Sequence, residues 1–374
     1  MQKPVIVQAV HAFPPSIGGI ETHVLALSRA MVAQGAQVIV HTSTCANSQS
    51  IDLPLKDEGI LVKRHFFISL PGFSSTKIIP FLCIHLMLEN ASVYCSHGFG
   101  AFVPFQASLA ALLKRKKFFW TIHGVPKFSG AKKIFLSAYS LVATIPLAIS
   151  KKLICVSESA RENLPLFAQK KCKIIPNGIS VDFFASEPGA NNSKSGFKII
   201  FVGRLDESKG VWLLLHSFEQ FYFAHKDSTL CFIGSDEGTK QKMQQFAKEK
   251  SLPVSFESLP VQEMSSAYAS ASLTVLPSQY EGFGLAVFES WACGTPAIST
   301  PVGAIPSFYQ DAFGADSQKF IFKDEKELLQ KLEDIHQMST TQIFKYAKNA
   351  KTALKQYRWE KIAKDTLELF NLQT

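Results

Sequence analysis

The sequence lacks the short motifs that mark several large enzyme classes. It contains no Asp-x-Asp pair, no H-E-x-x-H, no G-x-x-x-x-G-K-[ST], and no G-x-G-x-x-G after the first predicted strand. Each of these motifs places ligands for a metal, a phosphate or a dinucleotide at a fixed spacing. Their absence argues against metal-dependent sugar transfer, zinc hydrolysis, P-loop ATPase activity and NAD-dependent dehydrogenation. No metal site is expected.

Paired cysteines and long apolar segments are absent as well. The seven cysteines are an odd number and form no C-x-x-C pair, so neither a disulfide framework nor a zinc ribbon is predicted, and a reducing compartment fits. The longest apolar run, Ile134–Ile149, has 16 residues, whereas roughly 20 are needed to span a bilayer. The N-terminus has no signal-peptide pattern. We expect a cytoplasmic protein that is at most peripheral on the inner face of the membrane.

Acidic residues are scarce in the first half of the chain. Residues 1–180 hold 19 Lys and Arg against 7 Asp and Glu, whereas residues 181–374 hold 20 against 23. Residues 101–150 contain seven basic side chains and no acidic one. This pattern favours an anionic partner, for which nucleic acid, anionic lipid and phosphorylated glycan all qualify.

The chain has enough apolar material for two domains, with 47% hydrophobic residues among 374. Short apolar runs alternate with helical patterns, which predicts buried parallel strands in two open, doubly wound α/β domains. The predicted strands are 5–10, 38–42, 93–96, 118–122, 153–156, 173–175, 198–202, 229–233, 254–256, 272–276 and 296–299. We expect a first domain at 1–186, a polar linker at 187–196, a second domain at 197–355 and a C-terminal helix at 356–374 that crosses back to the first domain.

Two cations follow the first strand of the second domain. Arg204 and Lys209 lie between that strand and the next helix, at the sheet edge where open α/β domains bind ligands. A planar guanidinium and a compact ammonium together suit a diphosphate. The alternative is a solvated loop, with Arg204 paired to Asp206 or Lys209 paired to Glu207.

A Gly-rich turn follows another strand of the same domain and leads into a helix that starts near Leu285. Free backbone N–H groups at such a helix start can bind phosphate or sugar oxygens. Glu281 precedes the helix and Glu289 lies about one turn inside it, so two carboxylates can hold two separate hydroxyl-bearing groups. The alternative for Glu289 is a surface charge, which its apolar neighbours disfavour.

The first domain carries weaker candidates. Gly18 and Gly19 lie in the first strand–helix loop, where the lack of a Cβ lets a diphosphate approach the backbone, although a tight turn explains them equally. His123 ends a predicted strand and faces the same sheet edge. His11 and His97 end other strands with less local support.

Five segments together resemble the retaining GT-B glycosyltransferases of the family-4, or group 1, type. They are Gly18–Val24, His123-Gly124, Ile175–Gly178, Gly203–Gly210 and Glu281–Glu289. The resemblance covers nearly the whole chain, and the Arg…Lys-Gly and Glu-x7-Glu elements are its most specific parts. It implies two Rossmann-like domains that face each other across a cleft.

The resemblance also implies a UDP- or GDP-sugar donor held mainly by the second domain, with no cofactor and no metal. Arg204 and Lys209 would hold the diphosphate, Glu281 the donor sugar and Glu289 the ribose. The backbone of Phe283, Gly284 and Leu285 would contact sugar and phosphate. Gly19, beside Gly18, would approach the diphosphate from the opposite wall, and His123 would stabilise the oxocarbenium-like transition state.

The leading hypothesis is therefore sugar transfer to a glycan or lipid-linked acceptor in surface polysaccharide or glycolipid synthesis, beside an anionic membrane. The alternatives are a nucleotide-sugar epimerase on the same architecture and an inactive paralogue that serves as a partner subunit. No RNA- or DNA-binding motif accompanies the basic residues, which disfavours a nucleic-acid binder.

Overall fold

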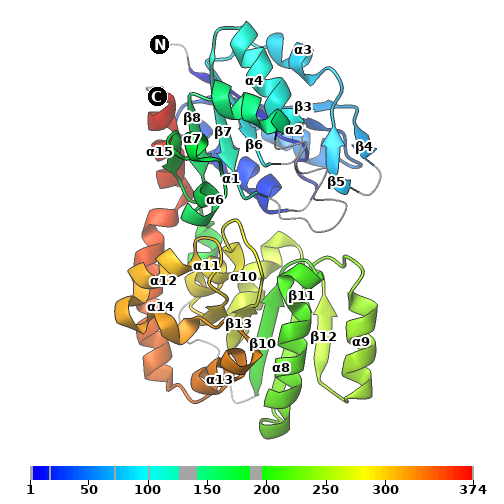
Figure 1. The fold of residues 1–374 in the computed structure, drawn as a ribbon, viewed down its shortest axis with the longest axis vertical. Coiled ribbons are helices and arrows are strands. Elements are labelled where there is room, and N and C mark those ends of the chain that lie inside the picture. The colour runs from blue at the N-terminus through cyan, green and yellow to red at the C-terminus, as the bar shows by residue number, and fades with distance from the viewer. Residues whose placement is uncertain are drawn as a thin grey trace. The chain divides into compact units, whose positions relative to one another are not determined.

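The computed structural model describes residues 3–16, 18–70, 73–99, 102–125, 141–185 and 196–372. The chain forms two compact units, of which unit 1 comprises Met1–Gly178 and Trp359–Thr374 and unit 2 comprises Ile179–Arg358. The division at Gly178 precedes the linker expected at 187–196, and residues 187–195 of that linker lie outside the described residues. Each unit is an α/β domain built on a parallel sheet (Figure 1).

Unit 1 contains a seven-stranded parallel sheet in the order β3-β2-β1-β6-β7-β8-β9, together with an antiparallel pair, β4 and β5. Its strands are β1 Val5–Ala9, β2 Gln37–Ser43, β3 Ile60–His65, β4 Ile68–Leu70, β5 Phe73–Ile78, β6 Val93–His97, β7 Lys117–Ile122, β8 Lys152–Cys155 and β9 Cys172–Ile174. Its helices include α1 Gly19–Ala33, α2 Gln49–Asp57, α3 Leu82–Met87, α4 Val103–Leu113, α6 Glu158–Glu162, α7 Leu166–Gln169 and α15 Trp359–Phe370.

Unit 2 contains a five-stranded parallel sheet in the order β12-β11-β10-β13-β14. Its strands are β10 Phe197–Val202, β11 Ser228–Ile233, β12 Val254–Glu257, β13 Leu273–Leu276 and β14 Ala297–Ser299. Its α-helices are α8 Val211–Ala224, α9 Lys240–Glu249, α10 Val261–Ala269, α11 Leu285–Ala292, α12 Ile305–Phe313, α13 Glu325–His336 and α14 Thr340–Ala353. Short 3₁₀ turns are η1 Val181–Phe184, η2 Glu207–Lys209, η3 Gly314–Phe320 and η4 Leu354–Tyr357.

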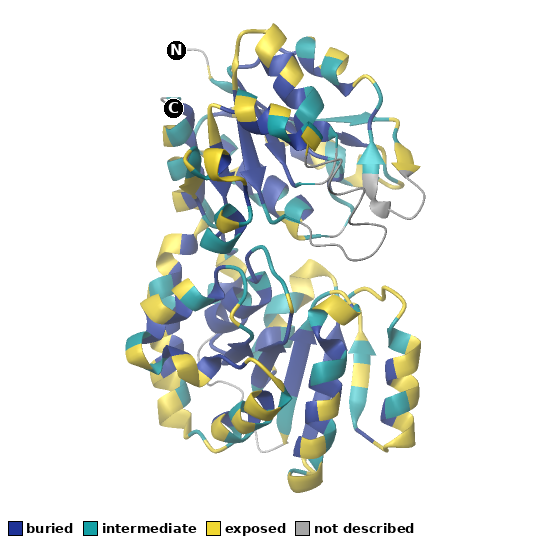
Figure 2. Ribbon diagram, in the orientation of Figure 1, coloured by how far each residue is buried: buried dark blue, intermediate teal, exposed yellow. Residues whose placement is uncertain are grey.

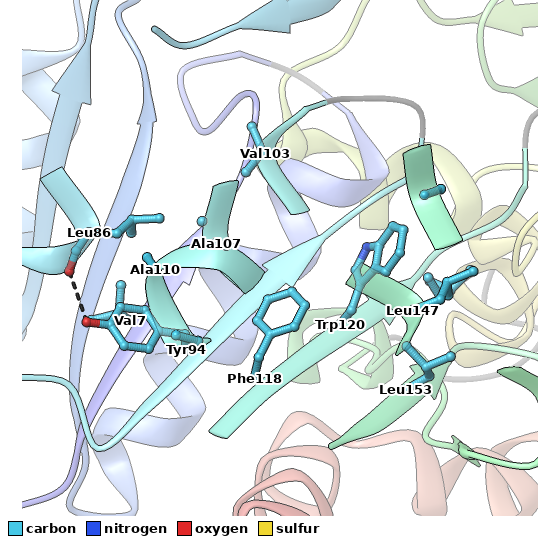
Figure 3. Close-up of a cluster of buried hydrophobic side chains, with 14 of the residues drawn as sticks. Val7, Leu86, Tyr94, Val103, Ala107, Ala110, Phe118, Trp120, Leu147 and Leu153 are labelled. Carbon is cyan, nitrogen blue, oxygen red and sulfur yellow. Dashed lines mark hydrogen bonds between the residues drawn. The ribbon is translucent and has the colours of Figure 1, made fainter. Parts of the chain in front are cut away.

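Both faces of the central strands are buried, which explains why they are continuous apolar runs (Figure 2). Successive residues of β7 show this: Phe118 and Trp120 enter the core on one face of the sheet, whereas Phe119 enters the core on the other. Figure 3 shows the first of these cores, in which the Tyr94 hydroxyl donates a 2.9 Å hydrogen bond to the Leu86 carbonyl. These largely apolar strands thus position the polar residues at their ends.

The C-terminal helical stretch is divided between the two units. α14 belongs to unit 2, whereas α15 packs on α1 in unit 1. Ile362, Leu367 and Phe370 of α15 are buried in the same core as Val24 and Leu27 of α1. The helix of unit 1 therefore begins at Trp359, three residues after the expected start at 356.

Candidate active site

Each parallel sheet has one place where the strand order reverses direction, between β1 and β6 in unit 1 and between β10 and β13 in unit 2. The loops that leave neighbouring strands on the two sides of such a point diverge, which opens a crevice for a ligand at their carboxyl ends. In unit 2 the loops after β10 and β13 are joined by a backbone hydrogen bond of 2.9 Å from Gln279 N–H to Ser208 C=O. These two loops carry Arg204, Lys209 and Glu281.

Lys209 forms an ion pair with Glu281 across these two loops. Lys209 Nζ lies 2.7 Å from Glu281 Oε1, and the side chains are only 15% and 17% exposed. Ser278 Oγ donates to the same carboxylate oxygen at 2.8 Å. The pairing of Lys209 with Glu207, which the sequence left open, is not the one that forms. Both of these donors meet Oε1, so neither of them occupies Oε2.

Gly210 brings these loops close together. Its φ is 68°, and a Cβ there would lie 2.1 Å from the Pro277 carbonyl oxygen, so only glycine fits. Arg204 is different, because its side chain is 58% exposed and its Nη2 is 3.6 Å from Asp206 Oδ2. This is the Arg204–Asp206 pairing that the sequence left open, but at this distance and with an exposed guanidinium it contributes little. The guanidinium is therefore free to rotate toward an anionic ligand.

The Gly-rich turn after β13 leads into α11 through Gly284. Gly284 has a φ of 97°, and a Cβ would lie 2.6 Å from Ile305 Cδ1. The preceding Phe283 is buried, and its carbonyl accepts a 2.9 Å hydrogen bond from Ala304 N–H. The turn is thus held by packing. Val287 N–H donates a 3.0 Å hydrogen bond to the Gly284 carbonyl, whereas the N–H groups at the very start of the helix, at Leu285 and Ala286, point out of the helix end. This arrangement suits phosphate or sugar oxygens.

Glu289 lies one turn inside α11 and is half-buried. Its Oε2 accepts a 2.8 Å hydrogen bond from the Tyr268 hydroxyl. Removal from water raises the pKa of Glu289 to about 7, although the Tyr268 hydrogen bond opposes the shift. The charged form of a carboxylate in this position is stabilised further when a ligand supplies additional hydroxyl donors. Tyr268 carried no distinguishing signal in the sequence.

Three histidines of unit 1 gather near its own switch point. His123 follows β7, His97 ends β6 and His23 lies on α1. The ring centroids of His23 and His123 are 4.5 Å apart, and those of His97 and His123 are 5.7 Å apart. Burial lowers the pKa of His123 well below its usual range, and the neighbouring histidines add to this shift. The ring of His123 is therefore neutral at pH 7.

The glycine pair of unit 1 stands at the start of α1. A Cβ on Gly18 would lie 2.2 Å from Glu21 Oε2, whereas a Cβ on Gly19 would meet nothing within 4 Å. Glu21 is buried, and desolvation raises its pKa. Packing against the described residues therefore does not explain Gly19, and the space above it can admit a ligand.

We expect Gly19→Ala to raise the KM for the donor while leaving the fold more stable. Alanine at the first helical position reduces the entropy of the unfolded chain, which stabilises by about 0.4–1 kcal/mol. A diphosphate against the backbone would lose a charge-assisted contact, and a tenfold rise in KM corresponds to about 1.4 kcal/mol. Thermal unfolding and donor-dependent kinetics measure both effects. An unchanged KM would show that the diphosphate does not contact this loop.

The comparisons with known proteins cover both units. The family described as Glycosyltransferase Family 4 matches residues 17–183, and the family described as Glycosyl transferases group 1 matches residues 184–357. The gpi3 subunit of Schizosaccharomyces pombe phosphatidylinositol N-acetylglucosaminyltransferase is 24% identical, over 96% of this chain and 78% of that protein. The matching subunit of the human enzyme is also 24% identical, over 79% of this chain and 61% of that protein.

Solved structures show the same fold. Anabaena HepE in complex with UDP superimposes with a TM-score of 0.78 at 16% identity, covering 99% of this chain and 100% of that chain. Sucrose-phosphate synthase from Thermosynechococcus elongatus gives 0.78 at 19% identity, covering 99% and 98%. WaaG, a glycosyltransferase involved in lipopolysaccharide biosynthesis, gives 0.70 at 15% identity, covering 97% and 99%. The predicted GT-B architecture of two Rossmann-like domains is confirmed, and the chain belongs to the group 1, family 4 glycosyltransferases.

Proposed function

We propose that the protein is a retaining, metal-independent enzyme that transfers a sugar from a UDP- or GDP-sugar to a glycan or lipid-linked acceptor in surface polysaccharide or glycolipid synthesis. The observation that carries the proposal is the Lys209–Glu281 ion pair at the switch point of unit 2, with Arg204 on the same loop. The pair places the Lys209 ammonium, which would bind a diphosphate, beside the Glu281 carboxylate, which would bind a sugar. The names of the relatives, which include an N-acetylglucosaminyltransferase acting on phosphatidylinositol, support this class of reaction.

The side chains have distinct tasks in this proposal. Arg204 and Lys209 neutralise the negative charge that grows on the diphosphate as the bond to the sugar breaks. Glu281 accepts from sugar hydroxyls and Glu289 from the ribose. The acceptor oxygen attacks the anomeric carbon from the face that the diphosphate leaves, and its proton passes to the departing diphosphate oxygen. The neutral imidazole of His123 provides a polar group beside the positively charged sugar and adds no repulsive charge.

A panel of nucleotide sugars tests the proposal. The true donor should raise the unfolding temperature, because a ligand at 100 times its Kd adds about 2.7 kcal/mol. Release of UDP or GDP should then depend on an acceptor, and NMR of the product should show the anomeric configuration of the donor. Turnover of the sugar nucleotide without acceptor would instead identify an epimerase. Absence of any stabilisation would favour an inactive paralogue.

We expect transfer to continue in EDTA without loss of activity. Arg204 and Lys209 provide the positive charge that a divalent ion supplies in metal-dependent transferases, and the sequence has no Asp-x-Asp pair to hold such an ion. The measurement compares initial rates before and after chelation, followed by addition of Mg²⁺ or Mn²⁺. Activity that appears only when the ion is restored would contradict the prediction.

We also propose that unit 1 binds anionic bilayers reversibly. The packed pair α3 and α4 exposes large apolar side chains to solvent. They are Phe81 at 72%, Ile84 at 58%, Leu88 at 77%, Leu112 at 55% and Leu113 at 57%. The exposed basic run 114–117 follows α4 directly, so apolar and positive groups adjoin.

Among the described residues, no helix is long and apolar enough to cross a membrane. Lys127, Lys132 and Lys133, which are three of the seven basic residues within 101–150, lie outside the described residues.

We expect the protein to pellet with anionic vesicles and not with neutral ones. Each basic residue near an anionic surface contributes about 1 kcal/mol, and salt screens the attraction. Changing Lys114, Arg115 and Lys116 to Gln should therefore weaken pelleting strongly. A matched control changes three exposed lysines of unit 2, Lys242, Lys248 and Lys326, and should have little effect. Negligible pelleting with both lipids at low salt would favour a soluble acceptor. Equal loss of pelleting in both variants would contradict a specific role for residues 114–116.

A further inference from the structure

The histidine cluster of unit 1 has the composition of a metal site. His23, His97 and His123 each offer one ring nitrogen, and these three atoms lie within 4.8 Å of one another. His97 Nδ1 and His123 Nε2 are 3.5 Å apart. Two nitrogens on a tetrahedral Zn²⁺ at 2.0–2.1 Å are about 3.3 Å apart, so this pair already has the required separation.

A chain of buried hydrogen bonds fixes the orientation of His97. The Ser28 hydroxyl donates to the Val24 carbonyl at 2.6 Å, so Ser28 Oγ must accept the 2.8 Å hydrogen bond from Gln8 Nε2. Gln8 Oε1 then accepts from His97 Nε2 at 2.7 Å. The proton of His97 is therefore on Nε2, and the lone pair of Nδ1 points toward His123. Metal-binding histidines are commonly held through their second nitrogen in this way.

His23 supplies an independent observation. Its side chain is only 3% exposed, yet neither ring nitrogen has a hydrogen-bond partner in the described part of the chain. Asn177 Oδ1 is likewise buried without a hydrogen bond of ordinary geometry among the described residues, although the Asn177 side chain is close enough to His23 to act on it as a weak hydrogen-bond partner. Buried polar atoms without partners are costly. A metal on one His23 nitrogen would leave the other free to donate to Asn177.

We propose that His23, His97 and His123 bind a divalent transition-metal ion, for which Zn²⁺ is the best match, and that the bound ion inhibits sugar transfer. Three neutral imidazoles with an open fourth position are a common donor set for Zn²⁺. The inhibition rests on the proposed role of His123, because a coordinated Nε2 cannot face the sugar.

The binding test uses the full chain stripped with EDTA and titrated with Zn²⁺ by calorimetry and with Co²⁺ by absorption. We expect one equivalent to bind, with a Co²⁺ spectrum that lacks thiolate charge transfer. This criterion matters because Cys155 Sγ and Cys172 Sγ are 3.2 Å apart and could bind metal themselves. X-ray absorption of the Zn²⁺ form should show nitrogen and oxygen ligands only. Thiolate ligands, or no binding, would overturn the proposal.

Variants assign the ligands and the positioning residue. His97→Gln and His23→Gln should each weaken Zn²⁺ binding by more than 100-fold, whereas Gln8→Ala should weaken it by about 10–100-fold through loss of the support for His97. The exposed His216 of unit 2 is the control, and His216→Gln should bind Zn²⁺ normally. Unchanged binding in the His23 and His97 variants would overturn the proposal.

The same titration followed by transfer assays separates the two proposals. Inhibition by one equivalent of Zn²⁺, reversed by EDTA, supports both the site and the role of His123. Binding without inhibition supports the metal site and contradicts the role of His123 in transfer. Absence of binding overturns the metal site and leaves the proposed transfer reaction intact.

Discussion

Replacing Lys209 or Arg204 by alanine is expected to lower kcat/KM for sugar transfer by about 100–1,000-fold, because each cation meets charge that develops on the leaving diphosphate. The loss corresponds to roughly 2.7–4 kcal/mol of transition-state stabilisation. Steady-state kinetics with the true donor measure it. Near-normal kcat/KM in both variants would contradict the proposal that the loop after β10 binds the diphosphate.

The two variants should differ in their side effects. Arg204 is exposed and weakly paired, so Arg204→Ala should leave the unfolding temperature unchanged. Lys209→Ala leaves the half-buried carboxylate of Glu281 without its cation, which should destabilise the protein. Lys209→Ala combined with Glu281→Gln should recover part of that stability but not the activity. Lys248→Ala, on an exposed position of α9, is a control that should change neither property.

Glu289→Gln is expected to weaken donor binding about 10–100-fold at pH 8, because a hydrogen bond to a charged group contributes about 1.5–3 kcal/mol. The wild-type affinity should fall as the pH drops through about 7, where Glu289 gains its proton. The affinity of the variant should be nearly independent of pH in this range, so the two should converge near pH 6. Calorimetric titration of the nucleotide at several pH values tests this. If the ratio of wild-type to variant affinity stays constant across these pH values, the contact between Glu289 and the ribose is excluded.

The same carboxyl links stability to pH. Its folded-state pKa of about 7 lies above the ordinary value of 4.5, so the folded protein binds the proton more tightly than the unfolded chain. The free energy of unfolding contributed by this group therefore declines as the pH rises from 4.5 to 7. Glu289→Gln lacks this decline and should be relatively more stable at pH 8. Tyr268→Phe removes the hydrogen bond that favours the carboxylate and should move the transition to higher pH.

The sequence alone determined the fold class and the position of most site residues. Strands buried on both faces are continuous, largely apolar runs, so β1, β7 and β10 can be predicted from the sequence alone. Polar residues that follow such strands lie at one edge of the sheet, and Arg204, Lys209 and Glu281 do lie in the loops after β10 and β13 of unit 2. Their roles in binding a donor stay predictions. The edge strand β3 was missed because its residues Lys63 and Arg64 interrupt the apolar run, and the β4–β5 pair was not expected.

Only the tertiary structure decided which of these residues meet. Lys209 had a charged neighbour in sequence, yet it pairs with Glu281, because adjacent parallel strands bring loops 72 residues apart together. The contact of Tyr268 with Glu289, the convergence of His23 and His97 on His123, and the split between α14 and α15 arise in the same way. Local sequence sets which backbone segments form strands and helices, whereas pairing and burial depend on strand order, and strand order is a property of the whole chain.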